Sequence, residues 1–355
     1  EGSQLPYIDA ISYKNFTEEG PFVLAAAHGD IDMYSQSPLN RPRNKPVLAR
    51  NRKAGGYRLV DMKSASMNTM GICLNLTHKD PVKREIFQKK DFRIGLSHAI
   101  NRQNIINLIY QRQGRPWQTA PRPNAPFYDS EDFGTQFTEY DLDLANDHLD
   151  RAGYSARDKN GMRLGPDGKP ISINVLTQTR YFQMVDALQL IKPTWAKVGI
   201  DLRIHNIDLS LFYTRLDAYE YDCAVDVGEL GYVDMINDPR WLFATGGEPY
   251  APFWGNFYAG EDPREEPPKS MQRQMKIYLE EVRPATDRKA QYEGMRKITK
   301  IARDEFWCMG ISLPAKPYAV VSDRFHNVPD NMWFAFKYPT PGPTNICQYF
   351  ISDES

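Results

Sequence analysis

The sequence predicts an α/β fold, because strand patterns alternate with helix patterns through the middle of its 355 residues. Ile171, Ile173 and Val175 alternate with polar neighbours, as in a half-buried strand. An amphipathic stretch follows over residues 184–198, and a second strand pattern covers residues 202–207. This succession is typical of a layered sheet whose strands are joined by crossover helices.

Caps and apolar stripes indicate further helices on both sides of that region. The expected helices cover residues 18–28, 91–100, 105–113, 141–152, 269–281 and 287–305. Three segments lack such periodicity and are expected to be irregular: the basic stretch 41–53, the Pro-rich stretch 116–126 and the long stretch 228–266. Long irregular segments inside compact domains usually serve a function.

Composition excludes several classes of protein. The formal net charge is -1, so no bulk field attracts nucleic acid or anionic lipid. No apolar stretch approaches the roughly 20 residues of a membrane helix. The six histidines have no metal-site spacing, and we expect neither a metal nor a cofactor. The cysteines have no CxxC pair and are expected to be buried free thiols: Cys73, Cys223, Cys308 and Cys347.

Aromatic and acidic residues are concentrated in the irregular stretch 228–266. Aromatic rings can stack on sugar rings or apolar side chains, and carboxylates can hold an ammonium group or accept sugar hydroxyls. Core packing is the alternative, and we expect it for about two in three of these rings. Neither a GxSxG elbow nor a phosphate-binding loop occurs in the sequence.

Residues 91–102 resemble a family signature, the pattern D-x-R-x-A-x-x-x-A-I-D-R of the family 5 extracellular solute-binding proteins. Gly95 and Asn101 are the two mismatches. Weaker motifs of that family follow the same order along the chain. They are residues 6–9 for PYLD, 29–32 for GEID, 145–154 for the helix that ends in A-G-Y, 198–200 for x-G-I and 221–222 for FD.

Residues 253–268 are similar to a subgroup of that family that includes cello-oligosaccharide and α-galactoside binders. Peptide binders often carry Gly-Trp where this chain has Gly228-Glu229. The aspartate that meets a peptide's α-amino group in that subfamily falls nearest to Asp234, although the loop length before Pro239 differs. The similarity therefore favours an oligosaccharide without excluding a peptide.

The resemblance implies a periplasmic-binding-protein-like (type II) lobe with a mixed sheet and flanking helices, plus partial segments of a first lobe. Residues 77–325 are expected to form the second, ligand-binding lobe. Residues 1–76 are expected to be a remnant of the first lobe and hinge, and residues 326–355 a segment returning to them. Family members carry a long segment before PYLD, so this chain is expected to be the C-terminal part of such a protein, without its signal segment.

The implied function is the capture of an oligopeptide or oligosaccharide-type solute between two lobes and its delivery to the permease of an ABC importer, without a catalytic step. The implied protein is a periplasmic monomer whose partners are the solute and the permease, and not nucleic acid. We expect the ligand contacts to include Trp117, Glu229, Tyr232, Asp234, Tyr250 and Trp254.

The alternative is a carbohydrate-active hydrolase that uses carboxylates in the same cleft. Such an enzyme requires two carboxyl groups about 5 to 10 Å apart, one of them with a raised pKa.

Overall fold

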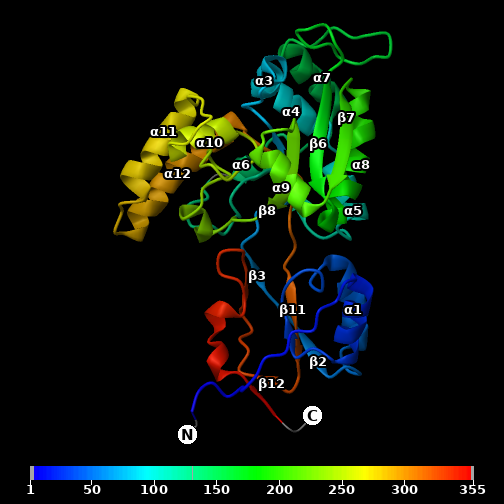
Figure 1. Ribbon diagram of the computed structural model, residues 1–355, viewed down its shortest axis with the longest axis vertical. Coiled ribbons are helices and arrows are strands. Elements are labelled where there is room, and N and C mark those ends of the chain that lie inside the picture. Colours follow the sequence, from blue (N-terminus) through cyan, green and yellow to red (C-terminus); the bar gives the residue numbers. More distant parts are fainter. Residues whose placement is uncertain (1–3, 130, 353–355) are drawn as a thin grey trace. The chain divides into compact units, whose positions relative to one another are not determined.

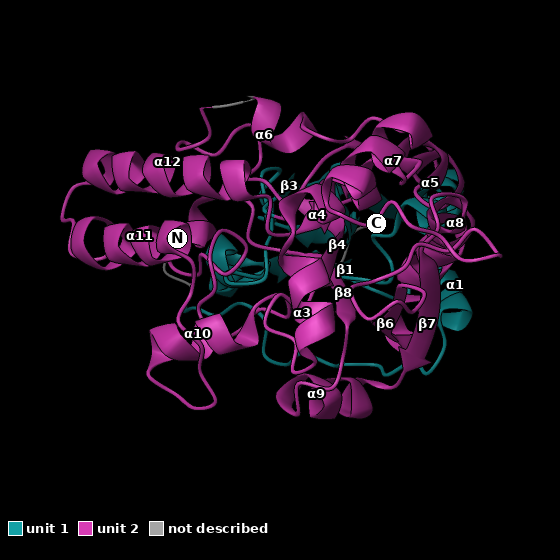
Figure 2. Ribbon diagram, turned by 90° about the horizontal axis from the view of Figure 1, so that it is seen from above, with its two compact units in different colours: residues 1–65, 314–355 teal, residues 66–313 magenta. Residues whose placement is uncertain are grey.

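The computed structural model describes residues 4–129 and 131–352, and the chain divides into two compact units. Residues 1–65 and 314–355 form one unit, and residues 66–313 form the other (Figure 2). The boundaries expected after residues 76 and 325 differ from these because of strand pairing. Strand β4 (Asn68–Leu74) pairs within the larger unit, and β11 (Tyr318–Ser322) pairs within the smaller one.

The smaller unit is built on an antiparallel three-stranded sheet in the order β1-β11-β2 (Figure 1). Helices α1 and α2 bury one face of this sheet, where Leu48 of α2 is fully buried. The stretch 41–53 is therefore largely helical, and not the exposed loop that its basic composition predicts. The remaining bounds are α1 (Glu19–His28), β1 (Met33–Tyr34), α2 (Lys45–Asn51), β2 (Tyr57–Asp61), β3 (Lys63–Ser64), β12 (Phe325–His326), β13 (Trp333–Phe334) and β14 (Phe350–Ile351).

The larger unit contains a five-stranded mixed sheet in the order β7-β6-β8-β4-β9. Strand β6 is parallel to β7 on one side and to β8 on the other, whereas β4 is antiparallel to β8 and β9. This arrangement confirms the α/β class and the mixed sheet that the sequence predicts. The strands are β6 (Ser172–Gln178), β7 (Asp201–Ile207), β8 (Cys223–Gly228) and β9 (Met309–Gly310), with a separate short pair of β5 (Arg115–Pro116) and β10 (Ser312–Leu313).

Helices cover both faces of this sheet. Helix α8 packs Trp195 and its apolar stripe onto the face that carries Val175, whereas Phe212 of α9 packs onto the opposite face beside Leu176. Helices α11 and α12 lie side by side at one end of the unit. The helices are α3 (Pro81–Gln88), α4 (Lys90–His98), α5 (Arg102–Leu108), α6 (Glu131–Thr135), α7 (Leu142–Arg151), α8 (Phe182–Lys197), α9 (Leu209–Asp217), α10 (Pro252–Ala259), α11 (Lys269–Ile277) and α12 (Arg288–Glu305).

The two arginines of the 91–102 signature are buried and hold backbone carbonyls. Arg93 donates to carbonyls at the C-terminal ends of α3 and α12, at 2.8 to 2.9 Å. Arg102 donates to the carbonyl of Ser97 at 2.8 Å and to that of Gly310 in β9 at 2.9 Å. Carbonyls at helix C-termini have no partner inside the helix, so a fixed guanidinium satisfies them.

The two mismatches in the signature keep its local structure. Asn101 accepts a hydrogen bond from the backbone N–H of Asn104 at 3.0 Å, so it caps α5 as an aspartate would. Gly95 lies where α4 meets α7, and a Cβ there would come within 2.8 Å of the Leu149 side chain and 2.9 Å of the Ala145 carbonyl oxygen. Glycine therefore allows a close approach of the two helices.

Asp222, just before β8, joins that strand to β6 and α3. Its carboxylate accepts hydrogen bonds from the backbone N–H of Asn174 at 2.9 Å and from its side-chain amide at 2.7 Å. It also pairs with Lys83 at 2.6 Å and with His78 at 3.1 Å. Burial alone would raise the pKa of this carboxyl, but the hydrogen bonds from His78, Lys83 and Asn174 hold it well below its ordinary value.

Glu248 stabilises the loop that precedes α10 by accepting hydrogen bonds from its backbone. Its Oε2 atom accepts hydrogen bonds from the backbone N–H groups of Thr245, Gly246 and Gly247 at 2.9 to 3.1 Å. Its Oε1 atom is buried and has no hydrogen-bond partner in the described part of the chain. Burial raises the pKa of Glu248 to about 7, although the three N–H groups act in the opposite direction.

We predict that Asp222→Asn lowers the free energy of unfolding by about 2 kcal/mol at neutral pH, because the hydrogen bonds lose their charged acceptor. Because the folded-state pKa is lowered, this contribution is present above the ordinary value of 3.8 and is lost as the pH falls below it. Urea unfolding measures the loss. The control is Asp217→Asn, at an exposed position on α9, and equal stabilities of the two variants would contradict the assignment.

A separate prediction concerns the contribution of Glu248 to the pH dependence of stability. Because its pKa is raised on folding, the folded protein binds this proton more tightly, and stability falls as the pH rises from the ordinary value of 4.5 through about 7. Glu248→Gln should remove up to about 3 kcal/mol of the stability difference between pH 5 and pH 8. The measurement is urea unfolding at both pH values, with the exposed Glu261→Gln as control. An unchanged pH dependence in Glu248→Gln would refute this role.

Candidate functional site

The carboxyl ends of β6 and β8 meet at one edge of the larger unit's sheet. The two strands are parallel, with Leu176 opposite Ala224. Because side chains alternate along strands, Gln178 and Asp226, two residues further on, project from the same face as neighbours. Ligands of open α/β sheets bind outside the carboxyl ends of strands, where successive connections diverge. We therefore take this edge, called the β6–β8 edge below, as the candidate solute site.

Polar groups from the β6 side are available at this edge. The Oε1 atom of Gln178 accepts a hydrogen bond from Arg180 Nε at 2.6 Å. Its Nε2 atom is buried and has no partner among the described residues. A buried donor without a partner is unfavourable by about 1 to 3 kcal/mol, so it suits an incoming acceptor. Arg180 is exposed, and its guanidinium lies over the Tyr181 ring, 4.5 Å from the centroid.

Carboxyl groups come from the β8 side. Burial, with repulsion from Asp226, raises the pKa of the partly exposed Glu229 to about 7, and Arg180 and Arg240 oppose this shift. Burial also raises the pKa of Asp226. The edge therefore contains acids that are unfavourable in their ionised form when no solute is bound.

Asp234 belongs to the same group of acids. Its Oδ1 atom accepts a hydrogen bond from the backbone N–H of Tyr232 at 2.9 Å. Its Oδ2 atom is buried and has no hydrogen-bond partner within the described ranges. Burial raises the pKa of Asp234 to about 6, and the nearby Asp238 adds to the shift. Tyr232 is half-buried and packs against the main core.

Three of the six residues expected to contact ligand lie inside the core. Trp117 is 1% exposed, and Arg115 lies over its ring at 4.6 Å. Tyr250 is fully buried. Trp254 is 3% exposed, donates to Glu265 Oε1 at 3.3 Å and meets the Trp307 ring edge to face. The other three, Glu229, Tyr232 and Asp234, lie in the segment that follows β8. The three buried rings pack in the core.

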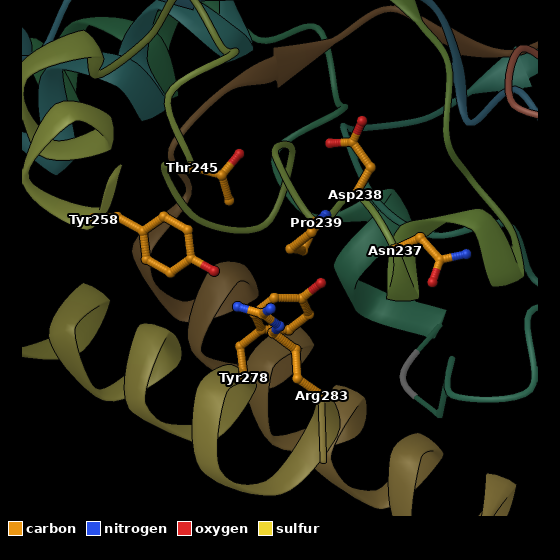
Figure 3. A pocket seen from close by; sticks show the side chains of 7 residues that line it. All are labelled: Asn237, Asp238, Pro239, Thr245, Tyr258, Tyr278 and Arg283. Atoms are coloured by element: carbon orange, nitrogen blue, oxygen red, sulfur yellow. The ribbon is translucent and has the colours of Figure 1, made fainter. Parts of the chain in front are cut away.

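The expectation that the 228–266 stretch lines an opening with aromatic rings therefore needs correction. Trp241 and Phe243 are also buried, because they fill the space over the sheet, where the Trp241 ring leaves no room for a Cβ at Gly71. Tyr258 is an exception: it lines a cavity of about 280 Å³ (Figure 3). The other lining residues, none of them among the six, are Asn237, Asp238, Pro239, Thr245, Tyr278 and Arg283.

Sequence reasoning missed Gln178, Arg180, Tyr181 and Asp226. The alternating pattern of β6 indicated a strand, and its polar end could have suggested a site. Which other strand end lies beside it depends on sheet order, which the sequence does not state.

Two further observations concern other kinds of site. Among the described residues, no three His, Cys, Asp or Glu side chains are grouped as a metal ion would require. Within those same ranges, no helix is both long enough and apolar enough to cross a membrane.

Solved structures resemble this fold. The oligopeptide-binding protein OppA superposes with a TM-score of 0.77 and 29% sequence identity, over 99% of this chain and 58% of that protein. The periplasmic binding protein MelB from Agrobacterium fabrum C58, in complex with stachyose, superposes with a TM-score of 0.74 and 16% identity, over 93% of this chain and 50% of that protein.

Sequence comparisons agree with the structural ones. A probable ABC transporter-binding protein from Deinococcus radiodurans is 22% identical over 222 residues, which are 61% of this chain and 36% of that relative. The sequence profile of the bacterial extracellular solute-binding proteins, family 5 (middle region), matches residues 2–249. With more than half of its length matched by that profile, this chain belongs to the family 5 bacterial extracellular solute-binding proteins.

Proposed function

We propose that this chain is part of the periplasmic substrate-binding component of an ABC importer, and that it captures a peptide or an oligosaccharide at the β6–β8 edge for delivery to the permease. Membership of family 5 supports this role. The observation that carries the location is the unpartnered Gln178 amide beside the raised-pKa carboxyl groups of Asp226 and Glu229. Asp234 lies close enough to Glu229 to raise its pKa, and Tyr232 belongs to the same segment after β8.

A solute with an ammonium group is the occupant that the charges favour. Burial and mutual repulsion make the ionised forms of Asp226, Glu229 and Asp234 unfavourable. A positive charge placed among them would relieve that repulsion, so the site and an ammonium group stabilise each other. The α-amino group of a peptide is such a charge, and OppA, which superposes on this chain, is an oligopeptide-binding protein.

An oligosaccharide is the second candidate. Residues 253–268 are similar to a subgroup with oligosaccharide binders, and MelB was solved with stachyose. Sugar hydroxyls can donate to a carboxylate and accept from the Gln178 amide, which needs no net charge on the solute.

We predict that the affinity of the intact protein for a tripeptide with a free amino group rises roughly tenfold between pH 5.5 and pH 7.5, because Glu229 ionises in that interval while the α-amino group stays mostly protonated. Glu229→Gln should weaken peptide binding roughly tenfold at pH 7.5, equivalent to about 1.4 kcal/mol, and flatten the pH dependence. Isothermal titration calorimetry measures both effects.

The matched control is Glu293→Gln, at an exposed position on α12, which should bind like the unmodified protein. Peptide affinity that is independent of pH and of Glu229 would exclude the ammonium proposal. Tight binding of stachyose with no response to peptides would select the oligosaccharide instead.

The hydrolase alternative also has a specific observation behind it, because a carboxyl with a pKa of about 7 beside a second carboxyl suits a general acid. The family consists of solute-binding proteins, which supports binding without turnover. We expect stachyose to be recovered intact after prolonged incubation with the protein at about pH 6, as measured by chromatography. Release of free sugar that disappears in Glu229→Gln would instead favour the hydrolase.

A further inference from the structure

Two cysteines of the larger unit lie opposite each other at neighbouring strands of its sheet. Cys73 lies in β4, and Cys308 directly precedes β9. The antiparallel register pairs Gly71 with Gly310 and Ile72 with Met309, so the next pair along the ladder is Cys73 with Cys308. Their sulfur atoms are 3.6 Å apart, and both side chains are buried.

This arrangement suits a covalent link without a shift of the strands. Directly opposite residues of an antiparallel pair have Cα atoms about 4.5 to 5.5 Å apart. A disulfide accepts Cα separations of about 4.4 to 6.8 Å and requires sulfur atoms about 2.05 Å apart. Rotation of the two side chains toward each other can close the remaining gap between the sulfur atoms.

The other two cysteines are poorly placed to compete for this link. Cys223 is opposite Leu74 in the β4–β8 ladder, and because side chains alternate, it projects from the face of the sheet opposite to Cys73. Cys347 belongs to the smaller unit and is exposed.

We propose that Cys73 and Cys308 form a structural disulfide in the exported protein. The proposal goes beyond solute capture and depends only on the extracellular location that the family implies, since disulfides form and persist in oxidising compartments. The link would tie β4, a central strand, to the segment that connects α12 with β9. It would close a loop of 235 residues, and long closed loops restrict the unfolded chain most.

The reaction requires a disulfide of a thiol oxidase as oxidant. One cysteine thiolate attacks the donor disulfide, which forms a mixed disulfide and releases one donor thiol. The second cysteine thiolate then attacks the mixed disulfide, forms the Cys73–Cys308 bond and releases the second donor thiol, so two protein thiols are oxidised as one donor disulfide is reduced. Exchange must occur before the core closes, because burial makes Cys73 inaccessible and raises its thiol pKa.

The test is peptide mapping of the full-length protein, purified from the extracytoplasmic fraction and alkylated in denaturant without reductant. We expect alkylated Cys223 and Cys347, and a linked peptide pair that contains Cys73 and Cys308. Protein made in a reducing cytoplasm should have all four of these thiols alkylated and unfold at a lower urea concentration. Alkylation of all four thiols in the exported protein, or a link through Cys223 or Cys347, would overturn the proposal.

Single variants supply an independent measurement on the same protein. Cys73→Ser should free Cys308 for alkylation, and Cys308→Ser should free Cys73, each with a lower urea midpoint. Cys223→Ser is the control and should leave the linked pair intact. If Cys73→Ser left the alkylation of Cys308 unchanged, the two residues would not be partners.

Discussion

The parallel pairing of β6 with β8 is the constraint on which the candidate site depends. Helix α8 follows β6, whereas the long segment that begins at Glu229 follows β8, so two different connections leave the sheet at neighbouring strand ends. The register places Gln178 beside Asp226 on the same face. A slip of one residue would exchange Asp226 with the buried Val225 and move a carboxyl into the core. Burial of the sheet therefore also fixes which polar groups are presented at its end.

The buried guanidinium groups of Arg93 and Arg102 stabilise the strands on one side of β8 through hydrogen bonds to backbone carbonyls in and before β9. Arg102 binds a carbonyl of β9, which pairs with β4, which in turn pairs with β8. Burial lowers the pKa of Arg93 to about 10 and that of Arg102 to about 9, so both stay protonated at neutral pH. In the described residues neither has an ion-pair partner, and backbone carbonyls at the ends of helices and strands stabilise their charge. The signature arginines therefore have a structural role, as donors to backbone carbonyls.

Elements set by local chemistry were predictable from sequence. Helix α7 begins after the Asp141 cap, as expected, because that side chain binds the first free N–H groups of the helix. Helix α2 was not predicted, because Leu48 acquires its core only when distant strands come together. The burial of Trp254 was equally hidden, because the sequence of residues 228–266 shows no helical period although Trp254 lies in α10. The acids after β8 could be named, but their neighbours at the end of β6 follow from strand order, which no local pattern specifies.

The most direct test of the central claim is a crystal structure of the intact protein with its natural solute retained through purification. The account predicts density at the β6–β8 edge, with a solute acceptor within hydrogen-bonding distance of Gln178 Nε2 and a solute donor against the Glu229 carboxylate. Solute bound in the cavity beside Tyr258 and Arg283, with the Gln178 amide still unpartnered, would contradict it.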